Sequence, residues 1–432
     1  MKEDSIYKTF IEYQEYPNTF PKELTDLWQM KGVCSLKEDL ITFKVTGLLI
    51  YMNKFFVIFP KAYKIPSTDS EKKYHIEVLI NVLLKYKNEA TMDPLEMELL
   101  GRENGDHTDN LITVYRLIQD FFQNGYLIKE MRVRSGKQCG KIDWPLTINR
   151  KQPFFSVSSV VYIDPIITKK IIDGQNLLLK LHKYCLYMGI KKYGWLMGIS
   201  PDIVEPENNL PNNYDLSFIL NFLTNELNST FVEREIKVIH LIIQYLSGIN
   251  LKDPKEKIET LATPYFQNVW ESMCSVNFNN QYHELKKIIP KLKWEIDSKA
   301  PIQPQRPDLM MVREKTLYIL DAKYYNVDKS LPGWSDIVKQ LFYAFTIYKN
   351  IQSCRPLLNL KLNNINNVFN AFLFPSSDSE AIKYIGKVEI EGNEQLGSVK
   401  SFKLNTFLMM KCYIGVEKLI YLNEFIKVIK HT

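Results

Sequence analysis

Two short patterns of charged residues in the last third of the chain could do chemistry together. Pro307-Asp308 precedes one short apolar run, and Asp321-Ala322-Lys323 ends the next. The turn-forming Arg313-Glu314-Lys315 between them predicts a hairpin, with strands over 309–312 and 316–325. Because side chains alternate along a strand, Asp321 and Lys323 share one face, and the hairpin returns Asp308 to the same edge. We therefore expect two carboxylates and one ammonium group to converge there.

Carboxylates held this close repel each other, and a hard divalent cation such as Mg²⁺ relieves the repulsion by taking oxygen ligands from both. Such a cation polarises a phosphate oxygen and lowers the pKa of a bound water, which makes a nucleophile near neutral pH. Lys323 could orient that water, help to deprotonate it, or offset negative charge that builds up on the phosphate. An Asp-x-Lys triplet alone is more often an ion-paired strand end, so the prediction depends on Asp308 upstream.

The set of Asp308, Asp321 and Lys323 resembles the PD-(D/E)xK nuclease motif in its McrC-like and RecB-like form. The resemblance implies a mixed sheet flanked by helices, with the two aspartates as metal ligands and Lys323 as the catalytic lysine. It also implies a third acid on the helix before the hairpin. Glu271, beside Trp270, is the preferred match, and Glu235 is the competitor.

The resemblance further implies a helix after the hairpin whose Gln and Tyr support the active site. In this chain the helix is expected to begin near Ser335, a residue type that often caps helices. Gln340 is the matching Gln, and either Tyr343 or Tyr348 is the matching Tyr. A solvent-facing polar residue is the plain alternative for both Gln340 and Glu271.

A second resemblance lies in the N-terminal half. The run Leu117–Tyr126 (LIQDFFQNGY) and the later Gly140–Ile148 (GKIDWPLTI) resemble the LlaJI family of restriction endonucleases. Pro145-Leu146 departs from that pattern, which has a basic residue there. Trp144 and Thr147 could read DNA, although a buried Trp and a strand Thr are the more frequent explanation for such residues.

The LlaJI resemblance implies a cytoplasmic restriction enzyme that hydrolyses phosphodiester bonds of foreign double-stranded DNA with Mg²⁺. It implies a McrB-like AAA+ GTPase and a cognate methyltransferase as partners, and the chain itself has no GxxxxGK[ST] pattern for binding nucleotide. Because cutting both strands needs two active sites or two events, a homodimer or a larger assembly is also expected. Two other functions remain open: a repair or transposition nuclease of the same superfamily, and a non-catalytic DNA-binding regulator.

Periodicity predicts an α/β protein in three parts. The first, 1–165, is an N-terminal α+β region for DNA recognition that resembles a winged helix. It has a hairpin over 41–64 around Met52-Asn53-Lys54, helices over 71–88 and 108–124, and an extended segment to Ile148. The second, 166–254, is a helical connector with helices over 168–193, 214–227 and 231–247 and a linker over 199–213. The third, 255–432, is the nuclease domain, with a helix over 264–275 before the hairpin.

The net charge of +6 is mild, but it is an average over unlike parts. Residues 131–200 hold twelve basic side chains against three acids. A charge cluster is often only a solvated face, while the functional interpretation is contact with DNA phosphates and salt-dependent binding. The residues predicted to bind DNA are Arg132, Arg134, Lys137, Lys141, Arg150 and Lys151.

Composition excludes several classes of protein. An apolar share of 45% with 54 aromatic residues excludes a disordered or fibrous chain. The six Cys are far apart without a CxxC pair, and the six His are scattered, so we expect reduced, buried thiols and no His- or Cys-held metal. The start of the chain does not resemble a secretory signal, and the most apolar stretch, 41–60, is interrupted by Lys44, Asn53 and Lys54, so no membrane helix is expected.

Overall fold

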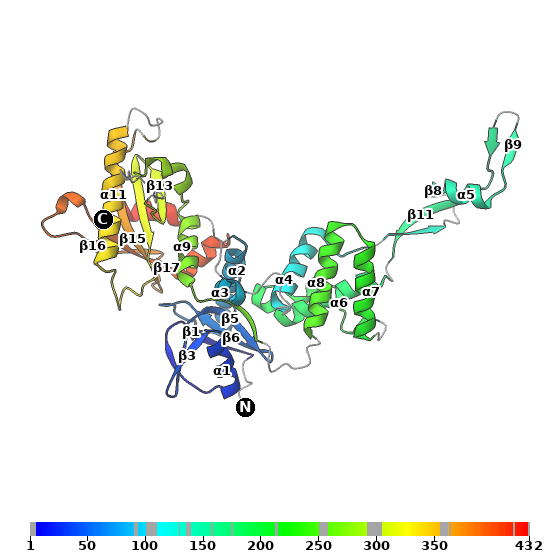
Figure 1. Cartoon of the computed structure of the whole chain (residues 1–432), viewed down its shortest axis with the longest axis horizontal. Coiled ribbons are helices and arrows are strands. Elements are labelled where there is room, and N and C mark those ends of the chain that lie inside the picture. The colour runs from blue at the N-terminus through cyan, green and yellow to red at the C-terminus, as the bar shows by residue number, and fades with distance from the viewer. Residues whose placement is uncertain are drawn as a thin grey trace, which may run out of the picture. The chain divides into compact units, whose positions relative to one another are not determined.

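The computed structural model describes residues 6–89, 94–100, 110–128, 130–134, 140–156, 159–173, 176–211, 215–249, 258–291, 305–354, 362, 364–417 and 420–430. The structure is mixed α/β, as predicted (Figure 1). The chain divides into two compact units: residues 1–103 with 254–432, and residues 104–253. The second unit is therefore an insertion within the first. Among the described helices, none is both long and apolar enough to cross a lipid bilayer.

This division groups the chain differently from the expected ranges 1–165, 166–254 and 255–432. The reason is strand β12 (Ile258–Thr263), which pairs antiparallel with β5 (Thr46–Tyr51). After the insertion the chain returns to the N-terminal sheet before it enters the C-terminal one. The helices expected to form one winged-helix-like element, α2 (Asp69–Glu89) and α4 (Asn110–Asn124), fall in different units.

The N-terminal sheet has the strand order β1-β6-β5-β12, with β1 (Tyr7–Ile11) parallel to β6 (Lys54–Phe59). The predicted turn is confirmed, because Met52 and Asn53 between β5 and β6 adopt left-handed angles, φ 46° and 59°. Besides α2, the described rest of this part consists of a three-stranded sheet and two helices. They are β2 (Glu15–Pro17), β3 (Cys34–Lys37), β4 (Leu40–Phe43), α1 (Lys22–Met30) and α3 (Pro94–Leu99).

The C-terminal sheet has the order β13-β14-β15-β17-β16. Its inner pairs, β14–β15 and β15–β17, are parallel, and its outer pairs, β13–β14 and β16–β17, are antiparallel. The strands are β13 (Leu309–Arg313), β14 (Thr316–Ala322), β15 (Asn367–Ser376), β16 (Ile382–Val388) and β17 (Val399–Asn405). The helices and short 3₁₀ turns around it are α9 (Phe266–Asn277), α10 (Tyr282–Leu285), α11 (Trp334–Cys354), α13 (Thr406–Tyr413), α14 (Ile420–Lys430), η4 (Lys286–Ile288) and η6 (Glu394–Leu396).

The sheet is apolar on both faces, as a partly parallel sheet covered by helices requires. Ile319 of β14 packs with Ile347 and Ile351 of α11 on one face. On the other, Phe369 and Phe402 meet Phe425 of α14. Since residues of equal parity share a face of a strand, Asp321 lies on the α11 face with Ile319. Figure 1 shows α11 running alongside the strands.

The second unit combines four long helices with a small β arm (Figure 1). The helical part consists of α4, α6 (Leu177–Tyr193), α7 (Leu216–Ser229), α8 (Glu233–Ile249), η1 (Gly194–Met197) and η2 (Pro201–Ile203). The arm consists of β7 (Glu130–Arg134), β8 (Lys141–Ile142), α5 (Trp144–Arg150), β9 (Phe154–Ser156), β10 (Ser159–Val161) and β11 (Ile167–Ile172).

Two expectations for this unit are wrong. Residues 144–150 are helical rather than extended, because Asp143 caps α5 by accepting a hydrogen bond from Leu146 N–H and Pro145 occupies its first turn. The predicted helix over 168–193 begins only at Leu177, since β11 precedes it. The loop 199–213, predicted as a linker, lies inside the second unit.

The cysteines agree with the expectation of buried, reduced thiols where they are described. Cys34, Cys185, Cys274 and Cys412 are free and buried. Cys139 and the Cys354 side chain lie outside the described residues.

Candidate active site

The predicted hairpin brings Asp308 to the end of β14. Leu309 of β13 pairs with Leu320 of β14, so Asp308, one residue earlier, lies level with the strand end. Its carboxylate Oδ2 accepts a hydrogen bond from the Ala322 N–H at 3.2 Å. This contact fixes Asp308 beside Asp321, which is buried with 4% of its surface exposed.

A polar loop after α9 fixes the free edge of β13. Asn280 donates from Nδ2 to the Asp308 carbonyl at 3.0 Å and accepts from Met310 N–H at 3.1 Å. Gln281 accepts from Val312 N–H at 3.1 Å. These contacts tie helix α9 to the strand that carries Asp308. Sequence reasoning missed both residues, because a polar run after a helix does not reveal which strand it will meet.

The surroundings of Asp308 disfavour its ionised form. Burial comes first, followed by the negative charges of Asp321 and Glu271, and together they raise the pKa of Asp308 to about 7. The hydrogen bond from Ala322 N–H opposes the shift without cancelling it. Such a shift is typical of carboxylates that share one site, where only a proton or a cation relieves the repulsion.

Lys323 is held between two carboxylates. Its Nζ lies 2.8 Å from Asp321 Oδ2 and 2.8 Å from Asp336 Oδ1. Burial alone would lower the pKa of Lys323, but the charges of Asp321 and Asp336 outweigh it, and the net shift is upward. The lysine therefore carries its positive charge near neutral pH. Asp336, in the first turn of α11, was not among the predicted site residues.

Glu271 is the acid that lies near this cluster. It is on α9, which the buried Trp270 anchors to the sheet through a 3.2 Å hydrogen bond from Nε1 to the Leu373 carbonyl. The Glu271 side chain is exposed, yet partial desolvation and the charge of Asp321 still raise its pKa, against the opposing effect of Lys323. Lys339 and Arg306 oppose the shift as well.

The competitor Glu235 belongs to the other unit. It lies in the first turn of α8, where it accepts a hydrogen bond from Thr230 Oγ1 at 2.5 Å. A hydrogen bond between a Thr before a helix and a Glu in its first turn is typical of a helix N-terminus, so Glu235 has a structural contact there.

Gln340 supports the site from within the core and touches none of its charged groups among the described residues. Its Nε2 donates to the Ile319 carbonyl at 3.2 Å and to Asn370 Oδ1 at 2.7 Å, while Asn370 Nδ2 donates to the Gln340 carbonyl at 3.1 Å. Gln340 therefore fastens α11 to β14 and β15, and it is not solvent-facing.

The two candidate tyrosines differ in their surroundings. Tyr343 is buried in the core under α11, whereas Tyr348 donates its hydroxyl to the Asn366 carbonyl at 3.1 Å. The expected cap Ser335 is instead the second residue of α11, because the helix starts at Trp334 and Gly333 accepts its first backbone hydrogen bonds.

Two aspartates, rather than three acids, form the tight part of the cluster. Within the described ranges, no group of three or more His, Cys, Asp or Glu side chains is placed to hold a metal ion. Asp321 Oδ2 is nevertheless buried without a hydrogen bond, since the Lys323 contact does not have hydrogen-bond geometry. A buried carboxylate oxygen next to Asp308, whose one described neighbour of opposite charge is the Lys323 ammonium group, is chemically suited to a hard divalent cation.

The chain matches the family described as LlaJI restriction endonuclease over residues 45–404. It belongs to the LlaJI family. That range includes every charged residue of the cluster described above.

Two further similarities extend over most of the chain. The Type II restriction enzyme BsuMI component YdjA of Bacillus subtilis (strain 168) is 26% identical over 415 residues, which are 90% of this chain and 85% of that protein. Among solved structures, a refined half-complex from the tetradecameric assembly of Thermococcus gammatolerans McrB AAA+ hexamers with bound McrC matches 98% of this chain and 99% of that chain. The TM-score of that match is 0.43, at 14% identity.

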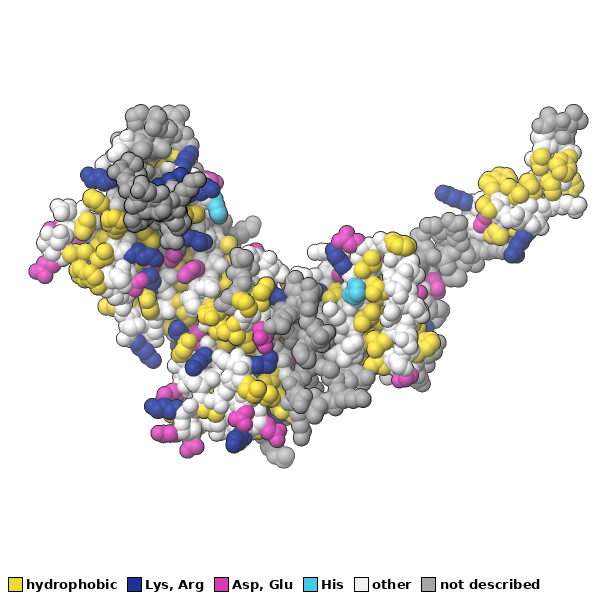
Figure 2. Space-filling model, in the orientation of Figure 1, with side chains coloured by type: hydrophobic (Ala, Val, Ile, Leu, Met, Phe, Trp, Pro, Cys, Tyr) yellow, Lys and Arg dark blue, Asp and Glu magenta, His cyan; other side chains and the backbone are white. Residues whose placement is uncertain are grey.

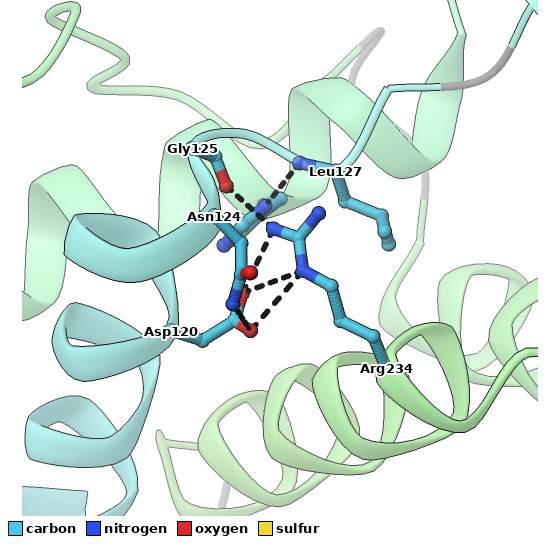
Figure 3. Close-up of polar contacts among 6 residues, drawn as sticks. Asp120, Asn124, Gly125, Leu127 and Arg234 are labelled. Atoms are coloured by element: carbon cyan, nitrogen blue, oxygen red, sulfur yellow. Dashed lines mark hydrogen bonds and ion pairs between the residues drawn. The ribbon is translucent and has the colours of Figure 1, made fainter.

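The first LlaJI-like run forms a structural brace in the second unit (Figure 3). Arg234 of α8 donates from Nη2 to Asp120 Oδ2 at 2.9 Å and to the Gly125 carbonyl at 2.6 Å. Asn124 also donates to Asp120, at 2.9 Å, and Gly125 ends α4 with a left-handed φ of 72°, as predicted. The next turn is held by His182, which accepts from Leu127 N–H at 3.0 Å. The run Leu117–Tyr126 and the turn after it therefore connect helix α4 to helices α8 and α6.

The second LlaJI-like run forms the base of the arm. A Cβ at Gly140, where φ is 153°, would lie 2.6 Å from the Thr168 carbonyl, so only glycine fits. Thr147 is buried and accepts from Ile166 N–H at 3.0 Å, which makes it structural. Trp144 is 52% exposed, so the expectation that it is buried is wrong.

The predicted DNA-binding residues lie on the same arm where they are described. Arg132 and Arg134 are on β7, although their side chains are not described, and Lys137 lies outside the described residues. Lys141 and Arg150 are exposed, and Lys151 forms an ion pair with Asp164. All belong to a different unit from the carboxylate cluster.

Proposed function

We propose that the chain is the nuclease subunit of a type II restriction enzyme, and that it hydrolyses phosphodiester bonds of foreign double-stranded DNA with Mg²⁺. The observation that carries this proposal is the pair Asp308 and Asp321, held together at the buried end of β14 next to Lys323. Membership of the LlaJI family supports the same function.

Asp308 and Asp321 are the residues that would hold the cation, with Glu271 as the third acid. Mg²⁺ bound there would polarise the phosphate and activate a water. Without a cation the two aspartates repel each other, which raises the pKa of Asp308. A bound cation would remove this repulsion, so the geometry of the site favours cation binding. The other two residues have separate roles. Lys323 offers a fixed positive charge to the phosphate rather than a base, and Gln340 keeps α11 against the strand.

The first test is metal dependence. The full chain, alone and together with the other subunits of its restriction system, is incubated with unmethylated plasmid DNA in Mg²⁺ or in EDTA. We expect cutting in Mg²⁺, none in EDTA, and recovery when Mg²⁺ is added back. A protein that shifts DNA equally with both additions and never cuts it would contradict the proposal. The same plasmid after methylation separates restriction, which methylation should block, from repair.

We propose that the arm binds a partner subunit. The relative YdjA is named as a component of a restriction enzyme, which supports a multi-subunit assembly here. A McrB-like AAA+ GTPase and a methyltransferase are the partners we propose. The arm has a surface suited to such contact, since hydrophobic side chains gather on it (Figure 2, upper right). Phe155 is 79% exposed and Ile163 is 71% exposed. Further exposed apolar residues there are Ile142, Trp144, Ile148, Phe154, Val160 and Val161.

The geometry of the β9–β10 hairpin strengthens this proposal. Neighbouring Phe154 and Phe155 point to opposite faces of a two-stranded hairpin, and both are exposed. A two-stranded hairpin is marginally stable in water by itself, and exposed apolar residues gathered in one place, like those described on this arm, mark protein contacts.

The basic and apolar sides of the arm can be tested against each other. We propose that Lys141 and Arg150 contact DNA phosphates, so Lys141→Gln with Arg150→Gln should weaken DNA binding and reduce its salt slope by about 0.9 per lost contact. Phe155→Ser with Val160→Ser should instead abolish co-purification with the other subunits and leave DNA affinity unchanged. Salt-dependent DNA titration and affinity purification measure the two effects. The partner proposal is wrong if the apolar variant still co-purifies fully with the other subunits. If the salt dependence of DNA binding is unchanged in the basic variant, Lys141 and Arg150 are solvent-exposed residues that do not contact DNA.

A further inference from the structure

Asp336 is the second anchor of Lys323. It comes from α11, while Lys323 follows β14, so the contact links a helix start to a strand end. Lys323 Nζ donates a hydrogen bond to Asp336 Oδ1 at 2.8 Å. Both side chains are largely buried, with 15% of Lys323 and 24% of Asp336 exposed.

The two carboxylates around Lys323 are used differently. The contact with Asp336 has hydrogen-bond geometry, whereas the contact with Asp321 Oδ2 has the same length but does not. Asp336 thus gives the ammonium group a hydrogen-bond acceptor outside the aspartate pair, and each oxygen of Asp321 has more than one lone pair, so Asp321 can still accept another ligand.

The position of Asp336 is fixed by its helix. It lies in the first turn of α11, where the helix dipole favours a negative charge, and its backbone N–H donates to Gly333 at 3.1 Å. Gln340, one turn further on the same helix face, is fastened to the Ile319 carbonyl of β14. Asp336 therefore has little freedom to follow Lys323 if the lysine moves.

We propose that Asp336 is a positioning residue that keeps Lys323 in place when Asp321 binds a divalent cation. This inference rests on the proposed nuclease function. Without Asp336, Asp321 is the remaining carboxylate against Lys323, so the lysine and the cation compete for one oxygen. With Asp336 present, the lysine keeps a partner of its own and remains beside the site.

A double-mutant cycle on Mg²⁺ binding tests this, measured by calorimetry on the full chain without DNA. Asp336→Asn should weaken Mg²⁺ binding by about threefold to tenfold when Lys323 is present. In a Lys323→Met background, the same change should have no effect, because the competing ammonium is gone. Equal weakening in both backgrounds would make Asp336 a metal ligand and overturn the inference.

Cleavage kinetics give the second readout. At saturating Mg²⁺ we expect Asp336→Asn to lower kcat by about 10- to 100-fold with KM for plasmid DNA unchanged, and Asp336→Glu to restore most of it. Asp328→Asn is the matched control, since Asp328 pairs with Lys403 in the same unit, at 2.6 Å and outside the cluster. An Asp336→Asn enzyme that cuts like the wild type, or that loses only KM, contradicts the inference.

Failure of the inference and failure of the proposed function look different. A wild-type protein that binds Mg²⁺ but never cuts DNA, even with all its subunits, removes the proposed function and leaves the binding cycle as the test of Asp336. A wild-type protein that binds no Mg²⁺ removes both.

Discussion

Asp321→Ala should abolish DNA cutting and leave a folded protein that still binds DNA. Asp321 is the buried carboxylate at the centre of the cluster, between Asp308 and Lys323. We expect a loss on the order of 10⁴-fold, the scale on which removal of one member of a catalytic unit acts. The fold should survive, because the change relieves the repulsion on Asp308 and Lys323 keeps its hydrogen bond to Asp336.

Cleavage of plasmid DNA and restriction of phage growth in cells that carry the whole system measure this effect. Asp328→Ala removes an exposed acid of the same unit and should cut normally. Gel shift of DNA and the melting temperature show whether binding and folding persist. A fully active Asp321→Ala enzyme would rule out the proposed site. If Asp321→Ala is unfolded, the same measurements are made on Asp321→Asn.

Asp308→Asn should make the metal-free protein more stable while it removes activity. The pKa of Asp308 is raised in the folded protein from 3.8 to about 7. A carboxyl with a raised pKa costs stability wherever it is ionised in the unfolded chain, so the cost is absent below about pH 4 and grows until about pH 7. At about 1.4 kcal/mol per pKa unit, a shift of this size sets an upper limit of a few kcal/mol on the cost. We expect Asn to recover about 1–3 kcal/mol at pH 8, because solvent reaches part of the side chain.

Calorimetric melting in EDTA at pH 8 and at lower pH measures this gain. The difference between variant and wild type should shrink as the pH falls toward about 4, since protonation removes the same charge in the wild type. Added Mg²⁺ should stabilise the wild type more than Asp308→Asn. Equal melting temperatures of the two proteins at pH 8 in EDTA would show that Asp308 carries no such cost.

The hairpin of the candidate site could be predicted because its contacts are local. Asp308 and Asp321 are brought together by one turn, and strand alternation places Lys323 next to Asp321. Asp336 and Asn280 could not be found in this way. Each meets the hairpin from a helix end, and the docking angle of a helix is set by core packing rather than by spacing along the chain.

The differences between the predicted and the observed elements also have specific physical causes. The helix at 144–150 was missed although Asp143 and Pro145 together are a helix-start signal. The exposure of the apolar residues in the hairpin 154–161 could not be predicted from the sequence. A strand that packs in a core and a strand that binds another protein have similar compositions. The division into units depends on the pairing of β12 with β5 across the whole insertion, which no local pattern encodes.

That pairing has a consequence for synthesis of the protein on the ribosome. The N-terminal strands emerge early, but the partner of β5 is made only after residues 104–253. Until then one side of β5, a wholly buried and mostly apolar strand in the finished protein, has no strand beside it. An open apolar edge is a template for wrong pairing, and contacts between distant segments form slowly. The N-terminal sheet therefore stays incomplete while the insertion is synthesised. During that time its exposed apolar edge favours binding of a chaperone to the nascent chain.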